Sequence, residues 1–252
     1  MKIFITFLFV LTIMNTNAQL ITPDTISTSK GSVIVQPVFH AALVLEWSGK
    51  SIYIDPYNGA DTYKSLKKPD LVLITDIHGD HMDLKTLQAL DLSGATLIVP
   101  QAVADKLPAE WKDKIVVLSN GKTTEQSGIS ISAIPMYNLP GDSTVRHPKG
   151  RGDGYIISLG GKKFYISGDT EDIPEMRGLK DIDVAFVCMN LPYTMSVEEA
   201  ASAVLDFKPK IVYPYHYRGQ NGFIYISQIL HRTYGRPHRS AGQWQDRRRW
   251  QS

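Results

Sequence analysis

The sequence has almost no cysteine. Among its 252 residues only Cys188 is a cysteine, so no disulfide bond can form within the chain. Cys188 lies in the apolar stretch DVAFVCMN, where we interpret it as a small buried residue rather than a nucleophile or a metal ligand. The sequence therefore offers neither a disulfide scaffold nor a thiolate site.

The main part of the chain also lacks a basic surface stripe. The formal net charge is +2, but residues 231–252 contain six Arg and one Asp, so the rest of the chain is mildly acidic. This distribution argues against nucleic-acid binding by the folded part. The basic segment contains Gly235, Pro237 and Gly242, which interrupt helices. We expect an atypical basic C-terminal tail over residues 223–252 that is poorly ordered from about His231 onward. Either this end of the chain is disrupted, or it forms a functional basic arm.

The only long apolar run lies at the N-terminus and is short for a membrane span. Lys2 precedes an apolar stretch over residues 3–14, and small and polar residues follow up to Ala18. This pattern predicts a signal peptide over residues 1–18 with cleavage before Gln19. No cysteine directly follows the run, so a lipoprotein anchor is not expected. We expect a periplasmic or secreted protein without stable membrane insertion after cleavage; the alternative is an uncleaved anchor.

The sequence shows no internal repeat and no low-complexity linker, which favours a single α/β domain over residues 19–222. Short apolar strands come first, and strands then alternate with helices. A Gly-Gly pair at residues 160–161 predicts a hairpin turn, and Ser196 with Glu199 forms a capping-box pattern before the clearest helix. The expected strands cover residues 32–39, 42–47, 51–55, 70–74, 95–100, 114–118, 129–135, 154–159, 162–167, 183–187 and 210–216, and the expected helices begin near residues 83, 102 and 196.

Ionisable side chains collect just after several of these strands. The apolar run LVLI is followed by TDIHGDH, which places Asp76, His78, Asp80 and His81 within six positions. Asp169 follows a strand in YISGDT, and His216 ends a strand in YPYHY. Both therefore belong to the same group of ionisable residues at strand ends. Strand ends of an α/β fold aim such side chains into a shared cleft. Because imidazole and carboxylate groups suit zinc and similar divalent ions, the pattern predicts a metal site.

These motifs resemble those of the metallo-β-lactamase-fold hydrolases. The quoted segments are TDIHGDH, YNLPGDSTVRHPKGRGDGY, SGDT and PYHY, together with the opening FHAALVLEWSGKSIYIDP. The similarity covers roughly residues 32–219 and is greatest to the branch of ascorbate-6-phosphate lactonase and N-acyl phosphatidylethanolamine phospholipase D-like proteins. It implies an αββα sandwich of two mixed β-sheets with helices on the outer faces.

The resemblance also implies roles for individual residues. His78 would help to hold a first metal, while Asp80, His81 and His216 would hold a second. Asp169 would bridge the two ions. A water or hydroxide held by the metals would be the nucleophile, and Asp80 would hold or orient it as the catalytic residue.

Two positions depart from the family pattern. Asp76 stands where the family usually has a histidine, and its harder, anionic oxygen makes Mn or Fe possible beside one or two Zn ions. The remaining ligand to the first metal is either His147 or Asn138. We favour His147, because a neutral imidazole is a much better ligand than a carboxamide; otherwise His147 faces substrate or belongs to a loop.

Four further residues are candidates for supporting or substrate-facing roles. Asp55 is predicted to accept a hydrogen bond from a ligand imidazole, although it could simply form the turn with Pro56. His40 either faces the cleft or ends its strand without a further role. Arg151, in a Gly-rich loop, could hold an anionic substrate group or be solvated. Asn138, the alternative to His147 as a ligand, is the fourth candidate for a supporting or substrate-facing role.

The sequence thus predicts an exported metal-dependent hydrolase that acts on a small molecule. An ester, lactone, amide or phosphodiester bond would each suit the chemistry, and neither the substrate nor the oligomeric state follows from the sequence. Two alternatives remain open at this point. One is a non-catalytic metal- or ligand-binding protein with a degenerate first metal site, and the other is an iron-dependent oxidoreductase on the same fold.

Overall fold

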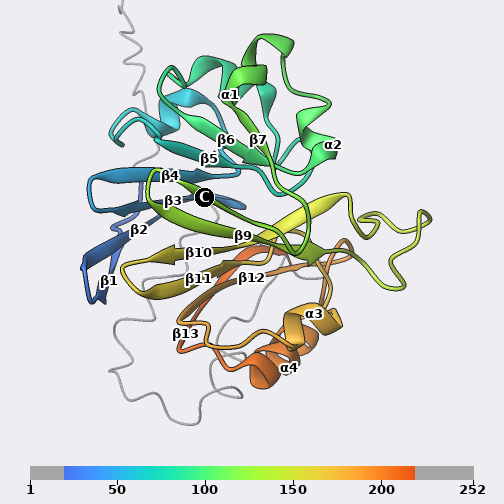
Figure 1. Cartoon of the computed structure of the whole chain (residues 1–252). Helices are drawn as coiled ribbons and strands as arrows, with labels where there is room; N and C mark the ends of the chain where they lie inside the picture. Colours follow the sequence, from blue (N-terminus) through green and yellow to red (C-terminus); the bar gives the residue numbers. More distant parts are fainter. Residues whose placement is uncertain (1–19, 219–252) are drawn as a thin grey trace, which may run out of the picture.

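A computed structural model describes residues 20–218 of the chain, which fold into a pair of mixed β-sheets that face each other (Figure 1). The first sheet has seven strands in sequential order, antiparallel from β1 to β4 and parallel from β4 to β7. These strands are β1 (Asp24–Thr28), β2 (Gly31–Phe39), β3 (Ala42–Trp47), β4 (Lys50–Ile54), β5 (Leu71–Leu73), β6 (Thr96–Val99) and β7 (Ile115–Val117).

The second sheet has six strands in the order β13-β12-β11-β10-β9-β8. It is antiparallel from β8 to β11, and parallel from β11 to β13. Its strands are β8 (Thr123–Gln126), β9 (Ile129–Met136), β10 (Gly152–Leu159), β11 (Lys162–Ile166), β12 (Val184–Asn190) and β13 (Ile211–Arg218). Both sheets are therefore mixed, which confirms the predicted architecture.

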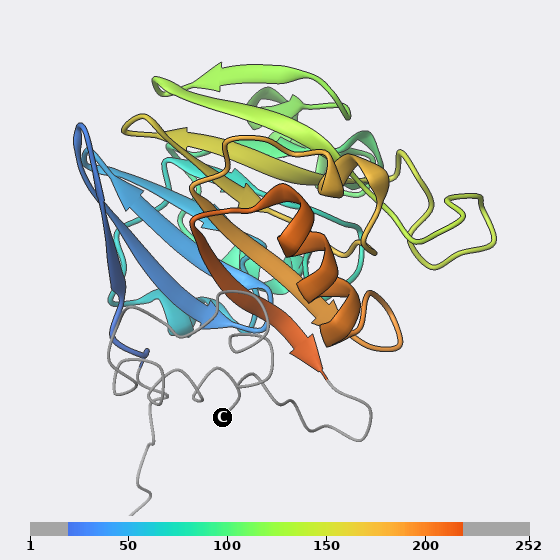
Figure 2. The ribbon, with the colours of Figure 1, turned by 90° about the horizontal axis from the view of Figure 1, so that it is seen from below.

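Helices cover the outer face of each sheet. The helices α1 (Leu84–Ala89) and α2 (Gln101–Ala104) lie beside the first sheet, and α3 (Pro174–Arg177) and α4 (Val197–Phe207) lie beside the second (Figures 1 and 2). Two 3₁₀ turns, Ala60–Tyr63 and Ala109–Lys114, complete the described elements. Within residues 20–218 no helix has both the length and the apolar character that a membrane crossing requires.

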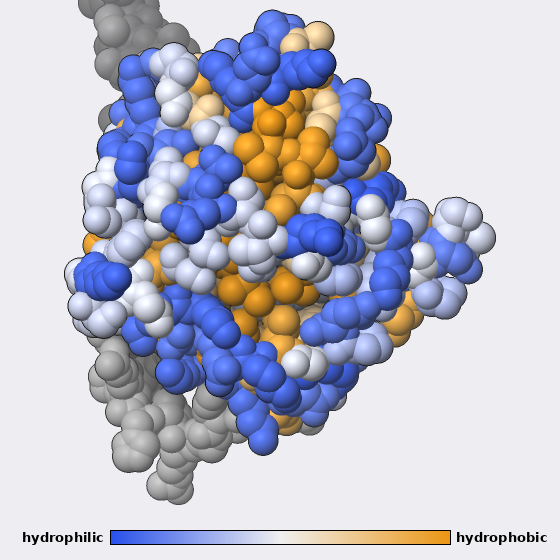
Figure 3. Space-filling model, viewed as in Figure 1, coloured by the Kyte–Doolittle hydropathy of each residue, from blue (hydrophilic) through white to orange (hydrophobic). Residues whose placement is uncertain are grey.

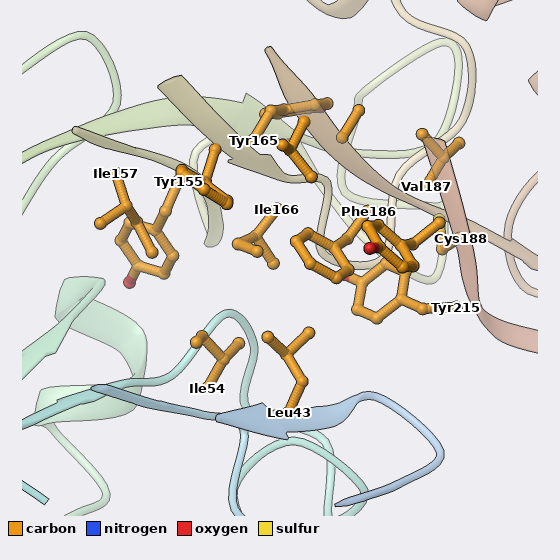
Figure 4. Packing of buried hydrophobic residues seen from close by; sticks show 14 of the residues in the cluster. Leu43, Ile54, Tyr155, Ile157, Tyr165, Ile166, Phe186, Val187, Cys188 and Tyr215 are labelled. Carbon is orange, nitrogen blue, oxygen red and sulfur yellow. The ribbon is translucent and has the colours of Figure 1, made fainter. Parts of the chain in front are cut away.

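The main hydrophobic core lies between the two sheets. Leu43 and Ile54 of the first sheet point toward Ile166 and Phe186 of the second (Figure 4), and all four are fully or almost fully buried. A second cluster under α1 and α2, including Val72 and Leu87, covers the opposite face of the first sheet. Burial on both faces explains why β5 and β6 read as continuous apolar runs. This rigid double layer holds the strand ends that carry the polar residues.

One partly exposed apolar region lies on the side of the molecule seen in Figure 3. There hydrophobic residues gather where Figure 1 places β6 and β7, framed by hydrophilic ones. Val117 in β7, an edge strand of the described sheet, is 40% exposed. The parallel strands are thus least covered at this edge.

Two strands and one α-helix were not expected from the sequence, and neither were the two 3₁₀ turns. The strands β1 and β8, DTIST and TTEQ, consist of polar residues apart from the buried Ile26, and form hairpins with β2 and β9 at opposite parts of the fold. Their pairing partners stabilise them, so the apolar signal that marks the other strands is missing. The third element, α3, is a single turn that begins at Pro174. The predicted hairpin at Gly160-Gly161 is confirmed, with both glycines at positive φ.

The helix α4 begins as its sequence predicted. The Ser196 hydroxyl accepts a hydrogen bond from the Glu199 N–H at 3.2 Å, and the Glu199 carboxylate accepts one from the Ser196 N–H at 2.7 Å. Two backbone donors that no helical turn can satisfy thus find acceptors. Ala200, Val204 and Phe207 then face the second sheet on the buried side of the helix.

Replacing Ser196 by Ala should lower the free energy of unfolding by about 1 kcal/mol, because the Glu199 N–H loses its acceptor. Chemical denaturation followed by circular dichroism measures this change. Ser196→Asp is the control and should retain most of the stability, since a carboxylate caps equally well. Equal losses in the two variants would contradict the role given to the cap.

Candidate metal centre

The loop after β5 brings four candidate residues together. The N–H groups of His81 and Met82 donate to the His78 carbonyl at 3.0 and 2.8 Å, which folds TDIHGDH into a tight turn. Asp83 then caps α1 by accepting from two of its backbone N–H groups. Because a strand end and a capped helix fix this turn on both sides, its side chains have little freedom to move away from the cleft.

A first cluster consists of Asp76, His78 and His147, whose ligand atoms all lie within 4.8 Å of one another. His78 Nδ1 lies 2.5 Å from Asp76 Oδ2, and His147 Nε2 lies 4.0 Å from the same oxygen. Asp76 and His147 are completely buried, and His78 is partly exposed. Two imidazoles and one carboxylate thus face a common point.

A second cluster consists of His81, Asp169 and His216, all buried. The Nε2 atoms of His81 and His216 lie 3.0 Å apart, and each is 3.3 Å from an Asp169 carboxylate oxygen. Asp80 borders this cluster, with its Oδ2 atom 3.5 Å from His216 Nε2 and 3.3 Å from His40 Nε2. His40 therefore faces the ionisable residues of the site, and it forms a third candidate group with Asp80 and His216.

Asp169 joins the first and second clusters. Its Oδ2 atom lies 3.2 Å from His147 Nε2 of the first cluster and 3.3 Å from His81 Nε2 of the second. Gly168, at φ 62°, makes this position possible, since a Cβ there would collide with the Met136 side chain. One buried carboxylate is consequently shared by donors from both groups.

At three residues of the site, interactions with neighbouring side chains outweigh the effect of burial on the pKa. Burial alone would raise the pKa of Asp169, but the facing imidazoles of His216 and His81 hold that pKa well below its usual range. Burial likewise opposes charge on His81, yet the carboxylates of Asp169 and Asp55 raise its pKa well above the usual value. Hydrogen bonds from His216 and His40 outweigh burial at Asp80 and lower its pKa as well.

This donor set fits divalent metal ions. His147 Nε2 and Asp169 Oδ1 are buried and have no hydrogen-bond partner in the described part of the chain. Two imidazole Nε2 atoms at 3.0 Å point their ring nitrogens at the same place. A cation bound between nitrogens and carboxylate oxygens would satisfy all of these atoms, and His with Asp is the ligand chemistry of zinc and related ions.

Asp55 fixes the His81 ring from behind. Its Oδ2 atom lies 2.8 Å from His81 Nδ1 and accepts a hydrogen bond from the Thr75 hydroxyl, while Oδ1 accepts one from the Thr75 N–H. The ring therefore presents Nε2 to Asp169 and His216 of the second cluster. The predicted supporting role of Asp55 matches this geometry.

Asn138 and His147, left as alternatives by the sequence, have different places. His147 lies in the first cluster, and its Nδ1–H donates to Asn138 Oδ1 at 2.7 Å. The Asn138 amide group is oriented by donating to Glu171 and to the Tyr193 carbonyl. Asn138 thus stands behind His147 and orients its ring, and Glu171 is a supporting residue that no sequence motif marked.

Arg151 occupies a place that the sequence did not suggest. Its Nε and Nη2 atoms donate to the two carboxylate oxygens of Asp76, at 3.2 and 3.1 Å. These two donors of the Arg151 guanidinium group are therefore used on Asp76, a member of the first cluster. The group is not freely solvated, and the two donors are not available to a substrate. No sequence motif indicates this pair, because 75 residues separate Arg151 from Asp76.

Several residues of the site have an unusual backbone. His40, Asp55 and His216 have positive φ values of 56°, 44° and 43°, a region that non-glycine residues rarely adopt. His40 and Asp55 directly follow β2 and β4, whereas His216 lies within β13, where the register with β12 shifts. Such conformations cost free energy and persist only where the surrounding packing enforces them, and they concentrate at functional sites.

A further buried acid, Asp153, lies beside the first cluster. Its N–H donates to the Thr75 carbonyl, and its carboxylate accepts a hydrogen bond from Asn120, but Oδ2 has no partner among residues 20–218. Burial raises the pKa of Asp153 to about 7. Sequence reasoning missed this residue, because a single Asp in a Gly-rich segment resembles a turn.

Asp153→Asn should remove some of the pH dependence of stability. The raised pKa means that the folded state keeps a proton that the unfolded chain releases near pH 4, so the contribution of Asp153 to the free energy of unfolding falls as the pH rises from about 4 to about 7. Each unit of pKa difference is worth about 1.4 kcal/mol. Denaturation of the chelator-treated proteins across this range should show the variant gaining on the wild type. Parallel curves would contradict the assignment.

Asp55→Asn should weaken binding of a divalent ion by about 10- to 100-fold, because an amide must turn one N–H toward the Thr75 or His81 donors. Calorimetric titration of the metal-free protein measures the effect. Asp70→Asn is the matched control, since Asp70 pairs with Lys50 away from the cleft and its loss should change stability alone. Unchanged metal binding in Asp55→Asn would refute the supporting role.

Comparison with known proteins gives these clusters a context. A family model described as "Beta-lactamase superfamily domain" matches residues 35–216, a range that contains every candidate residue from His40 to His216. A UPF0173 metal-dependent hydrolase of Pyrococcus abyssi is 33% identical over 187 residues, which cover 71% of this chain and 81% of that protein.

Solved structures agree with this similarity. The crystal structure of a Parabacteroides distasonis protein proposed to be a metal-dependent hydrolase is 40% identical, with a TM-score of 0.73, covering 82% of this chain and 91% of that one. The metallo hydrolase Igni18 from Ignicoccus hospitalis is 25% identical, with a TM-score of 0.67 and coverages of 80% and 90%. The chain therefore belongs to the metallo-β-lactamase superfamily and, within it, to the UPF0173 metal-dependent hydrolases.

Proposed function

We propose that this metal-dependent hydrolase uses a two-ion centre formed by the first and second clusters. The observation that supports it most directly is the Asp169 carboxylate, whose Oδ2 atom lies within 3.3 Å of a histidine nitrogen from each cluster. In this proposal Asp76, His78 and His147 hold one ion, and Asp80, His81 and His216 hold the other. Asp169 is shared between them.

The residues of the chain then divide the work. Bound ions would supply a water acidic enough to act near neutral pH and would polarise the bond to be cleaved. Asp80 is the most accessible acid of the set, with a side chain 33% exposed, and His40 and His216 hold it ionised. Asp80 thereby accepts a proton or hydrogen bond from the attacking water and keeps it oriented toward the substrate.

The substrate is proposed to be a small molecule with an ester, lactone, amide or phosphodiester bond. All four present an electrophilic centre and an oxygen that a cation can polarise. The Asp76 carboxylate gives the first cluster one oxygen where the family usually has a nitrogen, which makes Mn or Fe acceptable beside Zn. Iron with redox activity would favour an oxidoreductase, and one ion or none without turnover would favour a binding protein.

Asp169→Asn tests the centre. It should reduce bound metal from two ions per chain and lower hydrolysis of chromogenic esters, lactones and phosphodiesters by at least about a hundredfold, because both clusters lose a shared donor. Metal content is measured by mass spectrometry after gel filtration. Asp183→Asn is the control, since Asp183 pairs with Lys210 outside both clusters. A variant that keeps full metal content would show the site assignment to be wrong.

Export is a separate proposal that rests on the sequence of residues 1–18, which lie outside the described residues. The basic segment over residues 223–252 also lies outside the described residues. If the signal is cleaved as proposed, the protein recovered from the periplasm or medium begins at Gln19. N-terminal sequencing decides this, and a soluble cytoplasmic protein that retains Met1 would contradict it.

A further inference from the structure

Asp76 and Arg151 form a closely matched ion pair inside the centre. The Arg151 Nε atom lies 3.2 Å from Asp76 Oδ1, and its Nη2 atom lies 3.1 Å from Oδ2. The Asp76 side chain is completely buried, and that of Arg151 is 21% exposed. Two parallel hydrogen bonds from a planar guanidinium are the strongest arrangement that an Arg and a carboxylate can form.

The surrounding backbone is adapted to this pair. Gly152 follows Arg151 at the start of β10, and a Cβ there would lie 2.8 Å from the Thr75 carbonyl oxygen and 3.3 Å from Asp76 Oδ1. The next residue, Asp153, donates its N–H to the same Thr75 carbonyl at 3.0 Å. The glycine thus lets β10 approach the strand end that carries Asp76, and this approach brings Arg151 within reach.

Arg151 is distinctive among the cations of the described chain. No other Lys or Arg between residues 20 and 218 forms an ion pair with a member of either cluster. Lys149, two residues earlier on the same loop, pairs with Glu175 outside the clusters. The one carboxylate that replaces a family histidine is therefore the one that has a guanidinium partner.

Charge accounts for this coincidence. With a histidine at position 76, as in the family pattern, the first site would have three neutral imidazoles and no charge. Asp76 instead adds one negative charge in a buried place. A buried charge is tolerated when it is paired and hydrogen-bonded. The guanidinium supplies the opposite charge, so that Asp76 and Arg151 together have the same net charge as the histidine they stand for.

We propose that Arg151 is a positioning residue which makes Asp76 an electrically neutral ligand unit of the first metal site. It fixes the carboxylate plane and cancels its charge, and residues 76 and 151 consequently function only as a pair. The inference rests on the proposed two-ion centre, and deepens it by assigning Arg151 to the metal site instead of to an anionic substrate group.

The pair makes a prediction that a lone ligand does not. In the otherwise unchanged protein, Asp76→His leaves the guanidinium without its carboxylate next to a site for a divalent cation. Repulsion should then weaken zinc binding at the first site by about tenfold or more, even though histidine is the better zinc ligand. In an Arg151→Gln background that repulsion is absent, and Asp76→His should leave the affinity within about threefold or improve it.

The test is a double-mutant cycle on the full chain, with Asp76→His, Arg151→Gln and their combination. Zinc is titrated into chelator-treated protein by calorimetry, and the titrations are repeated with His216→Ala added, so that changes at the first site are separated from the second. Metal-free melting curves verify folding. Lys149→Gln is the matched control, because it removes a cation from the same loop without touching Asp76, and it should leave both affinities unchanged.

The outcomes separate the two proposals. The paired unit is supported if Asp76→His weakens zinc binding at the first site in the otherwise unchanged protein but not in the Arg151→Gln background. The same effect in both backgrounds overturns it while leaving the two-ion centre intact. Wild-type protein that binds neither zinc nor manganese nor iron at either cluster overturns both. If Arg151→Gln instead changes only the KM for an anionic substrate, with metal affinities unaltered, Arg151 binds substrate and the inference is wrong.

Discussion

The arrangement of this site depends on one buried carboxylate. Asp169 lies between imidazoles that come from distant segments of the chain, and its two oxygens are within 3.3 Å of His81, His147 and His216. Burying an acid without partners would be costly, and burying three imidazoles beside one another without an acid would also be unfavourable. Each group is acceptable only because the others are present, so the geometry of all four is fixed together.

The two sheets meet this demand in different ways. The first sheet contributes the turn after β5 and, through Asp55 at the end of β4, the hydrogen bond that orients His81. The second sheet contributes Asp169 after β11 and His216 on β13. The core between the sheets, with Phe186 and Leu43 fully or almost fully buried, offsets the strained backbone at His40, Asp55 and His216. Packing away from the cleft therefore maintains a rigid arrangement within it.

The sequence predicted those features that leave a local signal. The buried strands appear as apolar runs, the helix at Ser196 has its capping box, and the aspartates and histidines follow strand ends in short motifs. The strands β1 and β8 leave no such signal, because they are mostly polar and depend on pairing with β2 and β9, with Ile26 as their one core residue. The same reason explains the hidden roles of Asn138 and Arg151. A hydrogen bond to a ligand ring or carboxylate depends on the tertiary fold, and neither residue type identifies its partner in advance.

The position of His216 links the centre to the integrity of the second sheet. It lies on β13, which is the edge strand of that sheet in the described region of the chain, and edge strands have neighbours on one side only. Any ion held by His216 together with His81 and Asp169 binds the folded arrangement and not the separated strand. By thermodynamic linkage, ion binding and the docking of β13 therefore stabilise each other. Hydrogen exchange along β13, including residues that bind no ion themselves, would therefore report occupancy of the centre.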